Sequence, residues 1–129
     1  MEPDELRRFS WRSVHFAPAA EKGALARAAA GAYLAVLSGA GIAGQEELLD
    51  RLAAALRFPP YFGRNWDALD EMLRDLDWLP GAGCVVLVEG AAPLWAKQGR
   101  AAGRLVEAWL GAAETWAAGG AAFHLVFLW

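Results

Sequence analysis

The side chains best suited to chemistry gather in a single segment of the chain. Residues 65–77 contain one arginine, Arg74, and five acids: Asp67, Asp70, Glu71, Asp75 and Asp77. This segment alone is therefore more negative than the whole chain, whose formal net charge is −3. Carboxylates at this density can transfer protons, hold a cation or attract a basic partner.

A helix over residues 66–77 would sort these side chains onto two sides. The apolar side carries Trp66, Leu69, Met72, Leu73 and Leu76. The charged side carries Asp67, Asp70, Glu71, Arg74 and Asp75. The pattern predicts an amphipathic helix that packs through its apolar side and presents its acids to water or to a partner.

The charges on this helix repel one another. Asp67, Asp70 and Glu71 lie at i,i+3 and i,i+4 spacing, and Arg74 is the cation in the segment that offsets them. Such like-charge pairs cost a few tenths of a kcal/mol each. A solvated helix face is the ordinary explanation of a charge run, but the repulsion favours a surface that meets a basic partner.

An aromatic loop precedes the helix. Tyr61 and Phe62 stand directly before Gly63, which suits a positive φ that would orient both rings. We expect one ring to anchor the core and the other to be displayed, as tyrosine often is at interfaces. Asn65 is the predicted N-cap of the helix, with Asp67 in its first turn at the positive end of the helix dipole.

Catalytic and metal-binding uses of the acids are disfavoured. A Mg²⁺ site usually takes a more enclosed set of carboxylates, and these acids lie on a convex helix face without His, Ser or Cys close in sequence. The chain has no Gly-rich phosphate loop, C-x-x-C or H-E-x-x-H motif, and the isolated His15 and His124 are predicted to be structural. We therefore expect no catalytic residue, metal or cofactor. An enzyme using Asp67, Asp70 and Glu71 with a metal is the least favoured alternative.

Composition and length indicate one soluble domain, residues 1–129. Hydrophobic residues make up 57 % and charged residues 21 %, which is typical of a globular chain with a real core. The negative net charge argues against sequence-independent binding of nucleic acid. Cys84, the single cysteine, precludes an intrachain disulfide and is predicted to be a buried strand thiol.

The chain also predicts its compartment. Its N-terminus has no signal-peptide layout, and no apolar run approaches the roughly 20 residues that span a membrane. We expect a cytoplasmic protein without membrane contact.

Strands and helices alternate along the predicted chain after a frayed, charged lead at residues 1–10. Strands are expected at residues 11–16 (an edge strand), 32–37 (a central strand), 84–88 and 123–128. Helices are expected at residues 19–30, 44–57, 66–76, 91–98 and 101–118. This alternation predicts an α/β fold with a mostly parallel sheet.

The segment from Phe58 to Leu69, FPPYFGRNWDAL, resembles the signature of the barstar family, intracellular inhibitors of barnase-type secreted ribonucleases. The match is specific in the aromatic pair, the glycine, the asparagine two residues later and the following Asp-Ala-Leu. It extends more weakly, as an order of elements, through residues 32–128. Residues 1–31 have no counterpart in the family's type member and form an N-terminal extension to a core of residues 32–129.

The resemblance implies a small three-stranded, mostly parallel sheet packed by helices, with the extension adding an edge strand and a helix. It also implies that the helix and the loop before it occlude the active site of a basic ribonuclease, with acids standing in for substrate phosphates. Tyr61 matches the inhibitory tyrosine, and Asp67 and Glu71 match the helix acids. Gly63 and Asn65 match scaffold positions, and an acid of the penultimate helix falls near Glu114.

The chain departs from the family pattern on the helix. Glu71 replaces the main anchoring aspartate, Asp70 replaces an exposed tryptophan, and Arg74 and Asp75 replace small residues.

The acidic helix and the resemblance together predict an immunity protein, or antitoxin, that is a monomer when free and binds a basic ribonuclease or a related toxin. The alternative is an interaction or regulatory module on the same fold with a non-nuclease partner.

Overall fold

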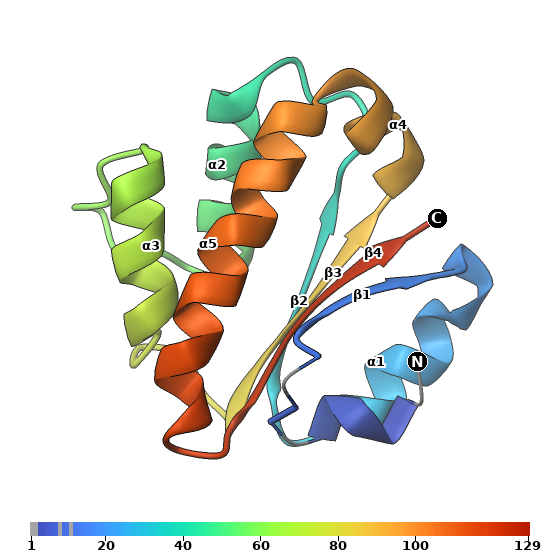
Figure 1. The fold of residues 1–129 in the computed structure, drawn as a ribbon, viewed down its shortest axis with the longest axis vertical. Helices are drawn as coiled ribbons and strands as arrows, with labels where there is room; N and C mark the ends of the chain where they lie inside the picture. The colour runs from blue at the N-terminus through green and yellow to red at the C-terminus, as the bar shows by residue number, and fades with distance from the viewer. Residues whose placement is uncertain (1–2, 8, 11) are drawn as a thin grey trace.

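A four-stranded parallel sheet separates two layers of helices in the computed structural model, which describes residues 3–7, 9–10 and 12–129 (Figure 1). The strands are β1 (Val14–Ala17), β2 (Tyr33–Ser38), β3 (Gly83–Glu89) and β4 (Ala122–Leu128), in the order β1-β4-β3-β2. All three pairings are parallel. The α/β class, the parallel sheet and the extra N-terminal edge strand are confirmed.

The predicted strand at residues 32–37 lies at the edge of the sheet and not at its centre. β2 pairs with β3 alone, and its Val36 is 39 % exposed. Strands β3 and β4 occupy the centre, and every residue of β4 is buried. An apolar run marks a strand that packs on both faces, but it does not say whether both edges are paired.

Helices run over most of the predicted ranges. They are η1 (Pro3–Arg7), η2 (Ala19–Glu21), α1 (Lys22–Ala28), α2 (Gln45–Ala55), α3 (Trp66–Asp75), α4 (Ala91–Lys97) and α5 (Gly99–Ala117). The lead at residues 1–10 was expected to be frayed, but it contains the 3₁₀ helix η1, whose Leu6 is fully buried. The predicted N-terminal strand begins later, at Val14, and its proposed first residue, Trp11, lies outside the described residues.

The two layers bury separate clusters against opposite faces of the sheet. Helices α2 and α5 cover one face, with α3 packed against α5, and Trp109 of α5 stacks on Phe123 of β4 with ring centroids 4.0 Å apart. On the other face, Leu6 and Leu25 pack against the outward side chains of β3 and β4. The N-terminal extension is thus a second helical layer over a sheet face that would otherwise be exposed (Figure 1).

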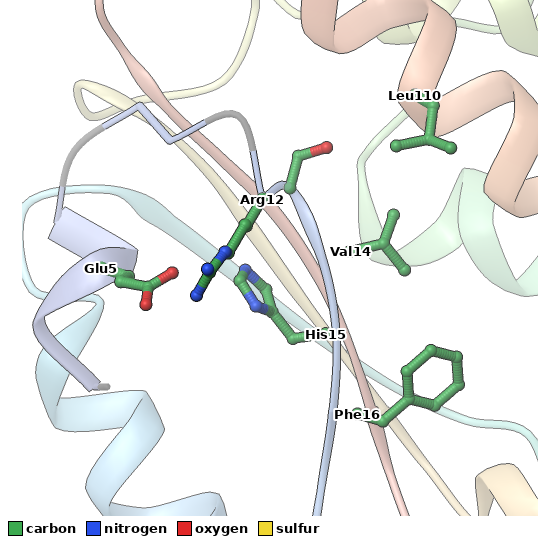
Figure 2. A pocket seen from close by; sticks show the side chains of 7 residues that line it. Glu5, Arg12, Val14, His15, Phe16 and Leu110 are labelled. Atoms are coloured by element: carbon green, nitrogen blue, oxygen red, sulfur yellow. The ribbon is translucent and has the colours of Figure 1, made fainter. Parts of the chain in front are cut away.

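β1 joins this extension to the sheet by parallel pairing with β4, and two histidines add a side-chain contact. His15 Nε2 lies 2.9 Å from His124 Nδ1 of β4, and both residues are buried. Figure 2 shows the side chains of Glu5, Arg12 and His15 on one side of β1, and those of Val14 and Phe16 on the other. The two histidines are therefore paired with each other, not isolated as the sequence suggested.

Candidate functional site

The loop between α2 and α3 begins with a left-handed helix cap. Arg57 has φ 54°, and the Phe58 N–H donates to the carbonyl of Ala53 at 2.9 Å. This is the hydrogen bond of a Schellman motif, with arginine where glycine is usual. Helix α2 therefore ends at Ala55, two residues earlier than predicted, and the chain turns before it reaches Pro59.

The two aromatic residues of the loop face in different directions. Phe62 packs against the main core and meets the ring of Phe58 edge-on, with centroids 4.8 Å apart. Tyr61 is 72 % exposed. The expectation that one ring anchors the core and the other is displayed is confirmed, and Tyr61 is the displayed one.

Gly63 serves a different purpose from the predicted one. The positive φ in this turn belongs to Arg64, at 53°, and Gly63 is not among the residues with positive φ. A Cβ at Gly63 would lie 3.2 Å from Nδ2 of Asn65 and 3.6 Å from Cβ of Ala68. A side chain at this position would have to shift the Asn65 amide by a few tenths of an ångström, so glycine leaves the capping side chain undisturbed.

Asn65 is the N-cap of α3, as predicted. Its Oδ1 accepts a hydrogen bond from the Ala68 N–H at 2.8 Å, and its Nδ2 donates to the Gly63 carbonyl at 3.3 Å. A side-chain acceptor at this position satisfies one of the free N–H groups of the first turn. The aromatic loop is thereby joined directly to the start of the acidic helix.

Helix α3 is amphipathic as expected. Leu69, Met72 and Leu73 are buried, while Asp67, Glu71 and Asp75 are exposed. Within the described part of the chain, none of these three acids forms an ion pair. They form an open acidic surface, which we call the α3 face.

Asp70 is not part of that open surface. Its Oδ2 lies 3.1 Å from Nη2 of Arg104 in α5, and the two side chains are 27 % and 30 % exposed. The Arg104 guanidinium also lies 5.6 Å from the ring centroid of Trp66. The sequence identified Arg74 as the cation that offsets the helix acids, but Asp70 is paired by a residue from another helix.

Helices α3 and α5 lie side by side (Figure 1), and the Arg74 side chain reaches α5 at Gly111. Its Nη2 lies where a Cβ on Gly111 would approach within 3.3 Å, so the missing side chain leaves room for the guanidinium. Trp116 Nε1 donates to the Leu73 carbonyl at 2.8 Å and joins the C-terminal parts of the two helices. Glu114 lies one turn after Gly111 on α5 and is exposed.

Two contacts fasten the loop and α3 to α2. Arg64 donates from Nε and Nη2 to the two carboxylate oxygens of Asp50, at 2.8 and 2.9 Å. Trp66 Nε1 donates to Oε1 of Gln45 at 3.0 Å. Sequence reasoning missed Asp50, Gln45 and Arg104, because their partners lie 14, 21 and 34 residues away and no local pattern links them.

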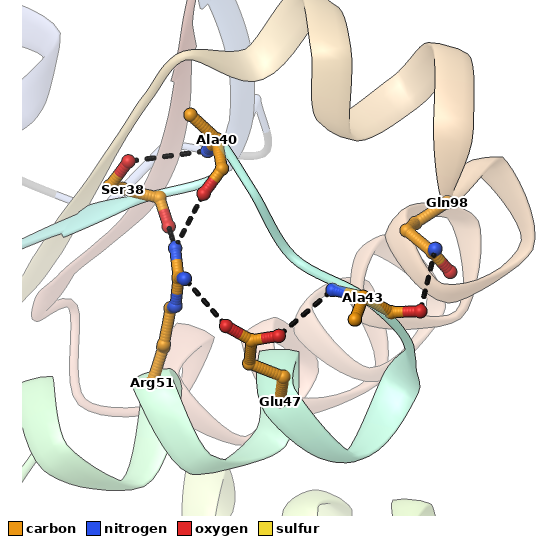
Figure 3. A network of polar contacts seen from close by, with 6 residues as sticks. All are labelled: Ser38, Ala40, Ala43, Glu47, Arg51 and Gln98. Carbon is orange, nitrogen blue, oxygen red and sulfur yellow. Dashed lines mark hydrogen bonds and ion pairs between the residues drawn. The ribbon is translucent and has the colours of Figure 1, made fainter.

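The start of α2 is itself fixed by a polar network (Figure 3). Arg51 donates to the carbonyls of Ser38 and Ala40, both at 2.8 Å, and pairs with Glu47 at 2.6 Å. Glu47 also accepts the Ala43 N–H at 2.8 Å. That backbone hydrogen bond, followed by the one from Arg51, lowers the pKa of Glu47. The network connects α2 to the end of β2, so the loop is attached to a helix that is itself fixed to the sheet.

The other candidate groups lie away from this surface. Cys84 is buried in β3, and burial raises its pKa to about 12, so the predicted strand thiol is confirmed. Among the described residues, no three His, Cys, Asp or Glu side chains are grouped so as to hold a metal ion. A search of the same residues for a helix both long and apolar enough to cross a membrane finds none.

Comparison with models of known protein families gives one match, over residues 32–128, to the model described as Barstar (barnase inhibitor). The match includes the loop, α3 and α5, and it leaves out the N-terminal layer. A comparison with curated proteins finds none that matches.

Proposed function

The chain belongs to the barstar (barnase inhibitor) family, and we propose that it is an intracellular inhibitor that occludes the active site of a basic ribonuclease or related toxin. It would act in the cytoplasm as an immunity protein, and as a monomer before it binds. The binding surface would consist of Tyr61, the α3 face and, at its margin, Glu114.

The observation that carries this proposal is the exposure of Tyr61 on the loop that leads directly into the acidic helix α3. The ring is 72 % exposed on a short loop whose last residue, Asn65, caps the helix. Asp67 and Glu71 follow on the exposed side of the same helix. An aromatic anchor beside unpaired carboxylates is suited to a partner with a cationic cleft.

A ribonuclease active site must bind phosphate, so it presents cationic side chains in a cleft. Carboxylates on a convex helix can enter such a cleft and take the places of substrate phosphates. Their field would also speed association, and salt would weaken this effect. The acids of the α3 face need no rearrangement to act in this way, since they are already exposed.

The direct test is inhibition of RNA cleavage by barnase, the enzyme that gives the family its description, and by any secreted basic ribonuclease encoded beside this gene. We expect a one-to-one complex that blocks cleavage and associates faster at low than at high ionic strength. A failure to inhibit either enzyme at micromolar concentrations would contradict the proposal.

The alternative is an interaction module with a non-nuclease partner, which the pairing of Asp70 with Arg104 favours. The family pattern has an exposed tryptophan where this chain has Asp70, and Arg104 neutralises Asp70. The middle of the surface therefore differs from the family pattern. Capture of a non-nuclease protein through α3, lost on substitution of Glu71, would support this alternative.

A further inference from the structure

Two arginines in the left-handed conformation bound the loop that displays Tyr61. Arg57 has φ 54° and Arg64 has φ 53°. A side chain in this conformation costs about 1 kcal/mol or more relative to the right-handed region. The side chain of each arginine contacts another residue. The Arg57 guanidinium lies 5.4 Å from the ring centroid of Tyr33, and Arg64 pairs with Asp50.

The Arg64–Asp50 contact has the geometry of a specific pair. Both carboxylate oxygens accept from one guanidinium, at 2.8 and 2.9 Å. Parallel hydrogen bonds of this kind fix orientation as well as distance. The hydrogen bonds to Asp50, with its charge, raise the pKa of Arg64.

Tyr61 depends on the loop backbone for its position. Its neighbours Phe58 and Phe62 are anchored in the core, and the Phe62 N–H donates to the Pro59 carbonyl at 3.0 Å. On the other side, the chain from Phe62 to the cap at Asn65 passes through Arg64. The Arg64–Asp50 pair therefore lies on the part of the loop between the anchored Phe62 and the helix cap at Asn65.

We propose that Arg64 is a positioning residue for partner binding: its pair with Asp50 of α2 holds the Tyr61 loop in the binding conformation before the partner arrives. The inference rests on the proposed function and adds a specific determinant to it. A loop that is ordered in advance loses less conformational entropy on binding, and the complex dissociates more slowly.

Because Arg64 and Asp50 carry opposite charges, a positioning role of their pair can be distinguished from the effect of net charge on association. Removal of Arg64 makes the surface more acidic, so steering alone predicts tighter binding to a basic partner. Removal of the Asp50 charge makes it less acidic, so steering alone predicts weaker binding. A positioning role predicts that both changes speed dissociation, although they alter the net charge in opposite directions.

The test compares Arg64→Asn, Asp50→Asn and the double variant in the full chain, with barnase as the partner. Asparagine is chosen at position 64 because it tolerates the left-handed conformation better than most residues. Arg27→Gln on α1 removes one positive charge from the opposite layer. Glu46→Gln removes one negative charge from α2 and leaves the Arg64 pair in place.

We expect either single variant to raise the dissociation rate by roughly 2- to 5-fold, the range that a well-oriented exposed pair supports. The double variant should be no worse than either single one, and both controls should keep the parent dissociation rate. Equal dissociation rates for the pair variants and their controls would overturn the inference while leaving the proposed function intact.

A second measurement needs no partner. Amide hydrogen exchange at residues 61–64 of the free protein should become faster in Arg64→Asn and Asp50→Asn, with unchanged exchange in β3. Unchanged exchange at residues 61–64 would also overturn the inference. If the parent protein does not bind barnase, the proposed function fails for that enzyme, and the exchange experiment still decides whether Arg64 orders the loop.

Discussion

Arg104 of α5 lies against Asp70 of α3, with Nη2 and Oδ2 3.1 Å apart. The same guanidinium lies over the ring of Trp66, so one cation joins α5 to two residues of the predicted binding helix. The pair neutralises Asp70, one of the five acids of residues 65–77, so its charge is not available to a partner. Asp67, Glu71, Asp75 and Asp77 remain as the open part of that charge.

Replacement of Arg104 should therefore affect binding rate and stability in opposite directions. Arg104→Gln leaves Asp70 unpaired and more available to a basic partner, so the association rate should rise about 2- to 5-fold at low salt. Loss of the half-buried pair and of the ring contact should lower the free energy of unfolding by roughly 0.5–1.5 kcal/mol.

Stopped-flow association with barnase and urea unfolding measure the two effects. Arg100→Gln, an exposed arginine in the first turn of the same helix, removes the same charge without touching Asp70. Equal rate increases for both variants would show that net charge, not the release of Asp70, is responsible.

Glu71 should matter more for binding than Asp77. Both acids are exposed, but Glu71 lies at the middle of α3, whereas Asp77 lies beyond its end. Glu71→Gln should weaken the ribonuclease complex by about 1–3 kcal/mol, and Asp77→Asn by less than about 0.5 kcal/mol. Isothermal titration at fixed ionic strength would compare them. Equal losses would place the footprint elsewhere on the acidic segment.

Tyr61 and Phe62 should separate binding from stability, although they are adjacent. Tyr61→Ala should weaken the complex by about 2 kcal/mol or more and change the free energy of unfolding by less than about 0.5 kcal/mol, because the ring is exposed. Phe62→Ala removes a ring packed on the core and should cost about 1–3 kcal/mol in unfolding. Denaturant titration and inhibition assays on both variants would test this division. The reverse pattern would mean that Phe62 is the ring the partner contacts.

The parts of the site that depend on neighbours in sequence could be predicted from it. The Asn65 cap and the division of α3 into a buried and an acidic side follow from side chains within one or two turns. Residue type alone could not say which ring of Tyr61 and Phe62 is displayed, because that depends on the path of the loop after Arg57; the family resemblance pointed to Tyr61. Residue type predicts the positive φ at Gly63, but it lies at Arg64, whose side chain pairs with Asp50.

The parts that depend on distant segments could not be predicted. Strand order decides that β2 is an edge strand, and an apolar run does not encode strand order. Arg104 is 34 residues from Asp70, so their contact follows from the packing of α5 on α3. The role of residues 1–31 follows from apolar side chains of β3 and β4 that point away from α5, such as Val85.

The N-terminal layer should stabilise the fold without taking part in binding. Leu25 of α1 is fully buried against the sheet face opposite α3. Leu25→Ala should lower the free energy of unfolding by about 2–4 kcal/mol and leave the affinity for a ribonuclease within about twofold. Urea unfolding and titration of the folded variant would test this. A large loss of affinity in a variant that remains folded would connect the extension to the binding surface.

The histidine pair between β1 and β4 should make the protein less stable as the pH falls. Burial, followed by repulsion from His124, lowers the pKa of His15 from 6.5 to about 4, while Glu5 opposes and Arg12 adds to the shift. The unfolded chain therefore takes up a proton near pH 6.5 that the folded chain refuses until about pH 4. The stability is complete above pH 6.5 and is lost as the pH falls through this interval.

We expect the free energy of unfolding to fall by roughly 1–3 kcal/mol from this source over the whole interval. Urea unfolding between pH 7 and pH 5 isolates the effect, because the lowered pKa of Glu47 acts below its ordinary value of 4.5. His15→Gln removes this titration, so its stability should depend less on pH, even if it is lower at pH 7. A variant with the same slope as the parent would show that His15 does not carry the proton. Since β1 belongs to the N-terminal extension, the protection of its amides against hydrogen exchange, corrected for the slower intrinsic exchange at low pH, should fall more at pH 5 than the protection of β3 amides.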